Sequence, residues 1–430
     1  MKNCVLLLFC LILALFLVLQ GPLLGALFLG FLLFSGYALL QGHPLRRVLA
    51  MAWSSIWKVR LLFIVFMLIG MLTGAWRASG TIAYLVLLFS EMIRPSCFLL
   101  LAFLANCAVS FLLGSSFATA ATMGVVSMNI GLSLGVPPLF TGGAILSGVY
   151  FGDRMSPVST SAMLVCVLTG TDIYRNIRSM ACSAFAPFLL ACAAYLLLGL
   201  RESAGAGAPA ADSLRGFAAL YSFSPWLLLP ALSILGCSLL HVPIRWNMAL
   251  SIALAALLAL FEQGMPAREL ARSLILGYRS PSPELSGLAD GGGLVSMLKV
   301  AAIVCLSSSY AGIFEATGLL DGLKAKFESL AARRGRAPAV AAAGLFSSLI
   351  ACNQTFAIVL THQICSRFGL SREKLALALE DSAVILSPLV PWSIACAVVL
   401  DATDSAAGAV FFAVYLYLIP LWNLWRSRGL

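Results

Sequence analysis

Charged residues are scarce in this chain of 430 residues. Asp, Glu, Lys and Arg together make up 10% of it, whereas a soluble domain carries about 25%. Hydrophobic residues make up 61%, and the mean hydropathy is +1.00. The shortage of charge excludes an ordinary soluble domain and indicates an all-α polytopic membrane protein. A span needs about 20 apolar residues, so we expect roughly ten to thirteen helical segments, some of them too short to cross.

The sequence also lacks the motifs of several functional classes. There is no HExxH pattern, no GxSxG pattern with the partner residues that hydrolysis needs, and no glycine-rich nucleotide-binding loop that could power a pump. The three histidines, His43, His241 and His362, are far apart, and the twelve cysteines form no CxxC or Cys/His pattern. We therefore expect no enzyme activity, no cofactor and no metal beyond a transported cation.

The net charge of +10 does not indicate nucleic-acid binding, because the basic residues lie in short connections between apolar runs. The first two runs, 4–19 and 23–40, are typical of a hairpin in the membrane. The next connection has four basic residues and no acid: Arg46, Arg47, Lys58 and Arg60. By the positive-inside rule this connection and the N-terminus face the cytoplasm, which predicts a multi-pass protein of a prokaryotic inner membrane. Its oligomeric state stays open, a homo-oligomer included.

The stretch GDRMSPVSTSAM, residues 152–163, is unusual for a membrane helix. Asp153, Arg154 and Pro157 lie between two apolar runs, and a charge near the bilayer centre costs several kcal/mol. Proline also removes a helix hydrogen bond. We interpret the stretch as a helix broken inside the membrane, whose freed backbone groups, hydroxyls and carboxylate line a cavity for an ion or small solute.

A second stretch, GSSFATAATMG at residues 114–124, gathers small residues at membrane depth. Such residues allow close helix packing, and they also fit a broken segment that lines a pathway. Both interpretations stay open for Gly114, Ser115, Ser116 and Thr119.

The two halves of the chain resemble each other. GHPLR at residue 42 is echoed by GMPAR at 264, GAWRASGTI at 74 by GIFEATGLL at 312, and GSSF at 114 by CNQT at 352. Asp153 with Pro157 is echoed by Asp381 with Pro388, at a different spacing. Four echoes in the same order indicate a duplication.

Charge indicates that the two copies are inverted. The segment 324–336 has five basic residues against one acid, while its counterpart near residue 91 is neutral, so the halves face opposite ways. We expect an N-terminal hairpin (1–41), a first inverted repeat (42–200), a linker with connecting helices (201–262), and a second repeat with the C-terminal helix (263–430).

Four motifs carry a family resemblance: GSSFATAATMG, SGVYFGDRMSPVS (147–159), LTGTDIYRNIRSM (168–180) and LEDSAVILSPLVPWS (379–393). Together they resemble the NhaC-type Na+/H+ antiporter family of the ion transporter superfamily. The resemblance covers about residues 42–392. It implies ion-coupled antiport, in which Na+, or in some relatives an organic acid, is exchanged against protons or a related solute.

Residue chemistry agrees with that implication. Na+ needs several oxygen ligands, and a carboxylate in a low-dielectric cavity can exchange a proton for a cation. Asp153 and Asp381, one in each half, are the candidates for this exchange, while Glu380 faces elsewhere if its segment is helical. The expected ion- or substrate-binding and proton-coupling residues are Asp153, Ser156, Ser159, Thr160, Asn353, Gln354, Asp381, Ser382, Ser387 and Ser393. Helix breaks are expected at Pro157, Pro388 and Pro391.

Several alternatives stay open. The family pattern has an acid and an amide where this chain has Thr160 and Met163. Either the cation site has shifted onto Asp153, Asn353, Gln354 and Asp381, or the chain carries a different solute, such as a small organic acid or amino acid, with protons. Asp153 could instead form an interfacial ion pair with Arg154. Arg77 and Glu315, at matching positions of the repeats, could pair with each other or lie at the surface. A channel is the rival to a transporter, but the twofold repeat with carboxylates favours the transporter.

Overall fold

The computed structural model describes residues 2–19, 22–58, 60–92, 94–157, 159–203, 221–240, 242–281, 290–319, 321–351 and 353–427. Within these ranges the chain is helical, and its only β-type pairing is an isolated bridge between Tyr278 and Gly291. The expected all-α polytopic membrane fold is confirmed.

In the first half of the chain, the described residues form eleven α-helices and one π-helical turn. They are α1 (Lys2–Val18), α2 (Leu23–Leu40), α3 (Leu45–Lys58), α4 (Arg60–Ala78), α5 (Thr81–Met92), α6 (Pro95–Leu113), α7 (Ser116–Thr119), the π-helical η1 (Ala120–Gly124), α8 (Val125–Ser133), α9 (Pro138–Met155), α10 (Thr160–Thr169) and α11 (Ile173–Ser203).

The second half alternates α-helices with short 3-10 and π turns. Its elements are η2 (Pro225–Leu228), α13 (Leu229–Leu239), α14 (Ile244–Phe261), α15 (Ala267–Leu276), η4 (Leu294–Met297), α17 (Leu298–Thr317), α18 (Asp321–Arg334), α19 (Arg336–Ala351), α20 (Gln354–Cys365), α21 (Arg372–Leu379), the π-helical η5 (Glu380–Val384), η6 (Ser387–Leu389), α22 (Ile394–Ala402), η7 (Ala407–Phe412) and α23 (Val414–Ser427).

Three of the described helices are long and apolar enough to cross a membrane: Pro95–Leu113, Ile173–Glu202 and Leu294–Phe314. Two bent pairs raise the number to five, with a bend of 68° between α4 and α5 and of 52° between the α21–η6 segment and α22. Large apolar side chains such as Phe185 and Leu197 are exposed on the outer surface, as expected of a surface that faces lipid. Unbroken and bent spans therefore both occur among the described helices.

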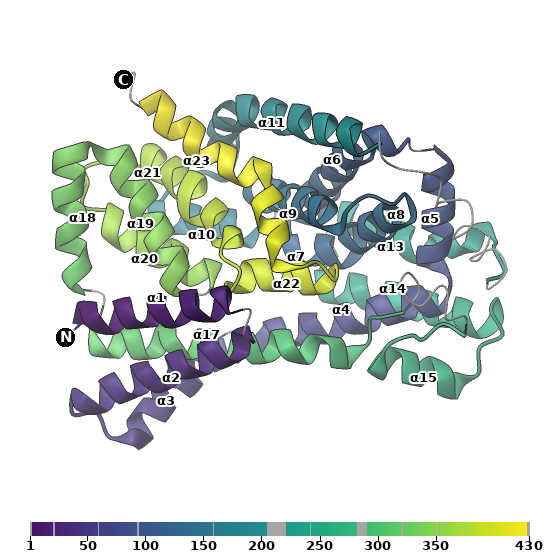
Figure 1. Ribbon diagram of the computed structural model, residues 1–430, viewed down its shortest axis with the longest axis horizontal. Coiled ribbons are helices and arrows are strands. Elements are labelled where there is room, and N and C mark those ends of the chain that lie inside the picture. The colour runs from purple at the N-terminus through teal and green to yellow at the C-terminus, as the bar shows by residue number, and fades with distance from the viewer. Residues whose placement is uncertain are drawn as a thin grey trace.

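Figure 1 shows α18–α21 at one end of the molecule and α5, α13 and α15 at the other, with α7, α9 and α22 between them. The break between α9 and α10 and the start of α22 thus lie in the middle part of the protein.

The first set of breaks recurs after 238 residues. Gly80 and Gly318 follow α4 and α17, and both have left-handed backbones (φ 80° and 56°), which glycine adopts without strain. The N-cap residues Ser115 of α7 and Asn353 of α20 have the same offset, and each side chain accepts a backbone N–H of its own helix. Helix ends in the two halves therefore share one local chemistry.

The second set of breaks recurs after 234 residues. Helix α9 spans 138–155, and α21 through η6 spans 372–389. Ser159 then caps α10 and Ser393 caps α22, and left-handed residues follow at Gly170 and Asp404.

This register matches Pro157 with Pro391 rather than with Pro388. The expected pairing of Asp153 with Asp381 is wrong, because the position equivalent to Asp153 is held by Ser387. The sequence comparison matched the wrong residues because a Ser-Pro pair occurs in both halves, at different distances from the serine that caps the next helix.

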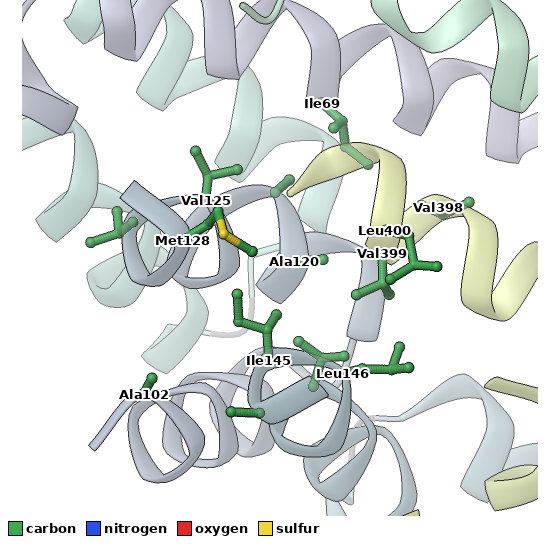
Figure 2. Close-up of a cluster of buried hydrophobic side chains, with 14 of the residues drawn as sticks. Ile69, Ala102, Ala120, Val125, Met128, Ile145, Leu146, Val398, Val399 and Leu400 are labelled. Atoms are coloured by element: carbon green, nitrogen blue, oxygen red, sulfur yellow. The ribbon is translucent and has the colours of Figure 1, made fainter. Parts of the chain in front are cut away.

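A buried apolar core joins the two halves. Figure 2 shows Val125 and Met128 of α8, Ile145 of α9, and Val399 and Leu400 of α22 gathered in one cluster, and all five are less than a tenth exposed. The breaks of the first and second halves are therefore held against each other by packing.

Helices α6 and α9 approach so closely that two glycines are required. A Cβ on Gly152 would collide with the backbone of Ser110 and Phe111, and one on Gly148 would lie 2.6 Å from the Cβ of Asn106. The replacement Gly152→Ala should destabilise the protein by about 1–3 kcal/mol or more through overpacking. Thermal unfolding in detergent measures this effect. Gly36→Ala in α2 is the control, since its Cβ would meet nothing within 4 Å; equal stability of the two variants would contradict the close approach.

Candidate functional site

The break between α9 and α10 arises from a local serine and proline pattern. Ser156 is extended (φ −81°, ψ 134°), Pro157 follows it, and the Ser159 hydroxyl caps α10. The hydroxyls of Ser159 and Ser161 both donate to the main-chain carbonyl of Asp153. The carbonyl released by the break is thereby satisfied, and Asp153 is fixed at the end of α9.

The carboxylate of Asp153 is buried and held by three side chains. Its oxygens accept from the Ser161 hydroxyl at 2.9 Å, the Ser159 hydroxyl at 3.3 Å and Nε2 of Gln354 at 3.2 Å. Only 4% of the residue is exposed. Because Gln354 comes from the other half of the chain, Asp153 lies at the meeting point of the two halves.

A cavity of about 210 Å³ opens beside Asp153. Its lining consists of the first turns of four helices, one side chain of α4, and Asp153 in the last turn of α9. These residues are Val65, Ser115, Ser116, Phe117, Asp153, Thr160, Asn353, Gln354, Thr355, Ile394 and Ala395. The start of α22 is tied to α9, since the Tyr150 hydroxyl donates to the carbonyl of Ala395 at 2.7 Å. Helix starts from both halves therefore converge on one carboxylate.

Six of the residues singled out in the sequence line this cavity: Ser115, Ser116, Asp153, Thr160, Asn353 and Gln354. Ser159 lies next to them through its bonds to Asp153. The small-residue stretch thus both lines the cavity, through Ser115 and Ser116, and packs, through the buried Thr119.

The other expected residues lie outside the cavity lining. Ser382 donates to the carbonyl of Ala378 at 2.6 Å, Ser387 to that of Ala383 at 2.7 Å, and Ser393 caps α22. Gly114 is the left-handed C-cap of α6. The turns at Ser156, Pro157, Pro388 and Pro391 shape the breaks. A larger hollow of about 910 Å³ beside Pro391 is lined almost entirely by apolar side chains, so it offers few ligands to an ion.

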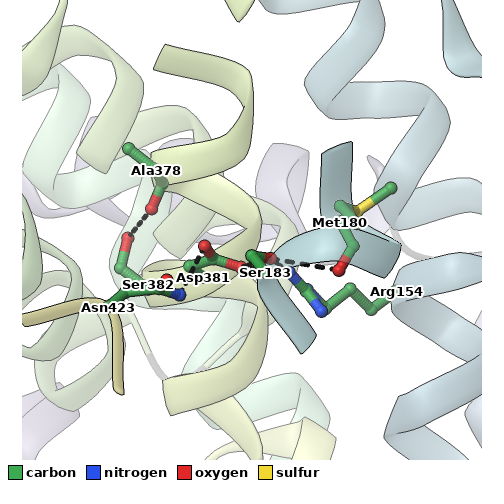
Figure 3. A network of polar contacts seen from close by, with 7 residues as sticks. All are labelled: Arg154, Met180, Ser183, Ala378, Asp381, Ser382 and Asn423. Atoms are coloured by element: carbon green, nitrogen blue, oxygen red, sulfur yellow. Dashed lines mark hydrogen bonds and ion pairs between the residues drawn. The ribbon is translucent and has the colours of Figure 1, made fainter. Parts of the chain in front are cut away.

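Asp381 is not the second carboxylate of the cavity. It forms an ion pair with the fully buried guanidinium of Arg154, and its carboxylate also accepts from Asn423 at 2.6 Å and from Ser183 at 3.4 Å. Figure 3 shows this network between α9, α11, η5 and α23. The alternative of an interfacial pair between Asp153 and Arg154 is also wrong, because Arg154 pairs with Asp381 in the interior.

Arg77 and Glu315 cannot be compared as a pair, since the side chain of Glu315 lies outside the described residues. Arg77 ends α4 in the interior, beside the backbone of Gly291, and its carbonyl accepts from the Tyr221 hydroxyl at 3.0 Å. This arrangement places Arg77 against the connection before α17.

Sequence reasoning missed Arg154 and Glu380 as a buried cluster. Glu380, which was expected to face elsewhere, is fully buried and lies within electrostatic range of Arg154. The sequence did contain a signal for this cluster. Arg154 and Glu380 are both charged residues in apolar surroundings, and each is adjacent to an aspartate.

Among the described residues, no group of three His, Cys, Asp or Glu side chains could hold a resident metal. The sequence profile of the Na+/H+ antiporter family matches residues 148–421, well over half of the chain. The chain belongs to this family. The matched range contains Asp153, Gln354 and the Arg154–Asp381 pair.

Relatives within and around this antiporter family differ in the solutes that they are named for. The chain is similar to the arginine/ornithine antiporter ArcD of Halobacterium salinarum (29% identity over 347 residues, 77% of this chain and 70% of that protein). It is similar to the malate-2H+/Na+-lactate antiporter of Bacillus subtilis (26% over 379 residues, 85% and 79%). It is also similar to the Na+/H+ antiporter NhaC of Alkalihalophilus pseudofirmus (25% over 371 residues, 84% and 80%).

Proposed function

We propose that this antiporter exchanges Na+ for protons across the cytoplasmic membrane, with the cation held in the cavity beside Asp153. The convergence of helix breaks from both halves on this one buried carboxylate is the observation that carries the proposal. We assign a transport role to this protein and no catalytic step.

The cavity offers oxygen atoms of the kind that a hard cation prefers. Asp153 supplies a carboxylate, Thr160 and Ser116 supply hydroxyls, and Asn353 and Gln354 supply amides. A proton and a cation would compete for Asp153, because either one neutralises a carboxylate that is costly to bury with its charge uncompensated.

The helix N-termini around the cavity make the negative charge of Asp153 necessary for cation binding. Helices α10, α20 and α22 each direct an N-terminal end, with its partial positive charge, toward the cavity. That potential repels a cation, so a cation stays bound only while Asp153 is ionised.

Alternating access would follow from movement of one half against the other. The constant offset within each set of helix breaks supports the two repeats expected at 42–200 and 263–430, and the basic connection Arg46–Arg60 supports an N-terminus in the cytoplasm. Because the breaks from both halves share the cavity, a small rotation would open it to one side at a time.

A second candidate is antiport of a small carboxylate-bearing solute. The same helix starts that repel a cation favour an anion, and about 210 Å³ exceeds what a dehydrated Na+ occupies; at about 30 Å³ per water it equals roughly seven water molecules. The names of the malate/lactate and arginine/ornithine relatives agree with this candidate.

Proteoliposomes with an internal pH dye separate the two candidates. We expect an outward Na+ gradient to drive proton uptake, with Li+ and K+ as cation controls and protein-free vesicles as the blank. Dicarboxylates and amino acids are then tested without Na+. Proton flux that appears only with an organic solute would replace the Na+ proposal by the second candidate.

A further inference from the structure

Glu380 is a buried acid that the cavity at Asp153 does not use. It begins the π-helical turn η5, its exposed fraction is 0%, and neither carboxylate oxygen has a hydrogen-bond partner among the described residues. It is not part of the cavity lining. An ionised carboxylate without partners is among the most costly groups to bury.

The nearby charges do not balance an ionised Glu380. Arg154 brings one positive charge, and it is committed to Asp381, which Ser183 and Asn423 also bind. Figure 3 shows these partners gathered around Asp381. With one guanidinium and two acids, charge balance leaves Glu380 neutral, so its carboxyl carries a proton in this conformation.

The elements packed around η5 supply few other charges. The groups that act most strongly on Glu380 are Arg154 and Asp153 of α9 and its own neighbour Asp381. Cys166 of α10 is also within electrostatic range of it, and Tyr415 of α23 lies beside Arg154. The remaining packed helices bring Arg336 at the start of α19, His362 and Cys365 on α20, and the exposed Arg372, Glu373 and Lys374 at the start of α21. Arg154 is therefore the one cation near Glu380 in the described interior.

The cavity is linked to η5 by direct contacts. Nε2 of Gln354 donates both to the Asp153 carboxylate, at 3.2 Å, and to the carbonyl of Val384 in η5, at 3.0 Å. Arg154 follows Asp153 on α9 and pairs with Asp381 in η5. A change in the occupancy of the cavity thus reaches the turn that holds Glu380 by two routes. Single π-helical turns such as η5 are frequent at functional sites.

We propose that Glu380 is a proton-binding site separate from the cavity at Asp153, and that it supplies a second proton to each exchange cycle. The proposal rests on the antiport function proposed above. In each cycle Asp153 and Glu380 each release one proton to water on one side of the membrane and become carboxylates, the cation replaces the proton on Asp153, and Arg154 is shared between Asp381 and Glu380 as their counter-charge. On the other side the cation leaves, and each of the two carboxylates takes up one proton from water. Two protons for one Na+ move one net charge, so the exchange responds to membrane potential.

The test compares wild type with Glu380→Gln, full length, in proteoliposomes that report radioactive Na+ and proton fluxes together. The wild type should move about two protons per Na+ and be accelerated by an imposed potential; the variant should move about one and lose the voltage response. Na+/Na+ exchange should persist in the variant, since the cavity is intact. Glu373→Gln is the matched control, because it makes the same change seven residues earlier, at an exposed position of α21.

A second measurement does not depend on the folding of a variant. Dicyclohexylcarbodiimide reacts with protonated carboxyls in apolar surroundings, and we expect mass spectrometry of the labelled wild-type protein to find the adduct on Glu380. A wild-type ratio of one, an unchanged ratio in Glu380→Gln, or absence of the adduct would each overturn the proposal. Wild-type vesicles that exchange no Na+ for protons would instead refute the proposed function, and the adduct would then still decide whether Glu380 holds a proton.

Discussion

Asp153→Asn is expected to lower Na+-driven proton flux about 10- to 150-fold or more, since one hydrogen bond to a charged group contributes about 1.5–3 kcal/mol. The protein should still fold and insert. The amide keeps the size of the side chain, and its one oxygen can still accept from Ser161, while its Nδ2 can only donate to Ser159. It cannot, however, carry the negative charge that offsets the helix starts around the cavity, and it cannot exchange a proton. Cation binding and proton exchange should therefore fail together, and Na+/Na+ exchange should be lost as well.

Asp172→Asn is the matched control for this variant. Asp172 is exposed and its carboxylate accepts the backbone N–H of Arg175, a capping role that asparagine fills equally well. Fluxes are measured in proteoliposomes, and size-exclusion profiles establish that both variants fold. Retention of proton-coupled exchange by Asp153→Asn would remove Asp153 from the mechanism and leave the cavity without its counter-charge.

The helix breaks were predictable because their chemistry is local. A capping hydroxyl or amide at Ser115, Ser159, Asn353 or Ser393 acts within its own first turn, and a left-handed glycine such as Gly318 ends the helix that precedes it. Such signals lie within a few residues of each other, so both the breaks and the family resemblance could be read from the sequence.

The partners of the buried charges could not be predicted in the same way. Arg154 and Asp381 are separated by 227 positions, and Gln354 and Asp153 by 201. Nothing local distinguishes an arginine that binds a distant aspartate from one that pairs with its neighbour. The alignment of the two halves from the sequence was also wrong, because Ser387, and not Asp381, occupies the position equivalent to Asp153. Only the packing of α9 against η5 and α23 decides which acid the guanidinium meets.

The Arg154–Asp381 pair should have an asymmetric effect on stability. Arg154→Met leaves Asp381 buried without its cation, and removing one partner of a buried pair costs about 3–5 kcal/mol. Asp381→Asn should cost less, because Glu380 can give up its proton and take over the guanidinium. Thermal unfolding in detergent, followed by tryptophan fluorescence, measures both variants at the same pH.

The double variant Asp381→Asn with Glu380→Gln decides whether this substitution of partners occurs. With neither acid available, Arg154 is an uncompensated buried cation, so the double variant should be destabilised about as strongly as Arg154→Met, by about 3–5 kcal/mol. Glu380→Gln alone should change stability little, since it replaces a neutral carboxyl by a neutral amide of the same shape. The excess of the double variant over the sum of the single ones is then the free energy with which Glu380 replaces Asp381. Simple additivity would mean that Arg154 never reaches Glu380, and the guanidinium could not be the counter-charge when Glu380 releases its proton.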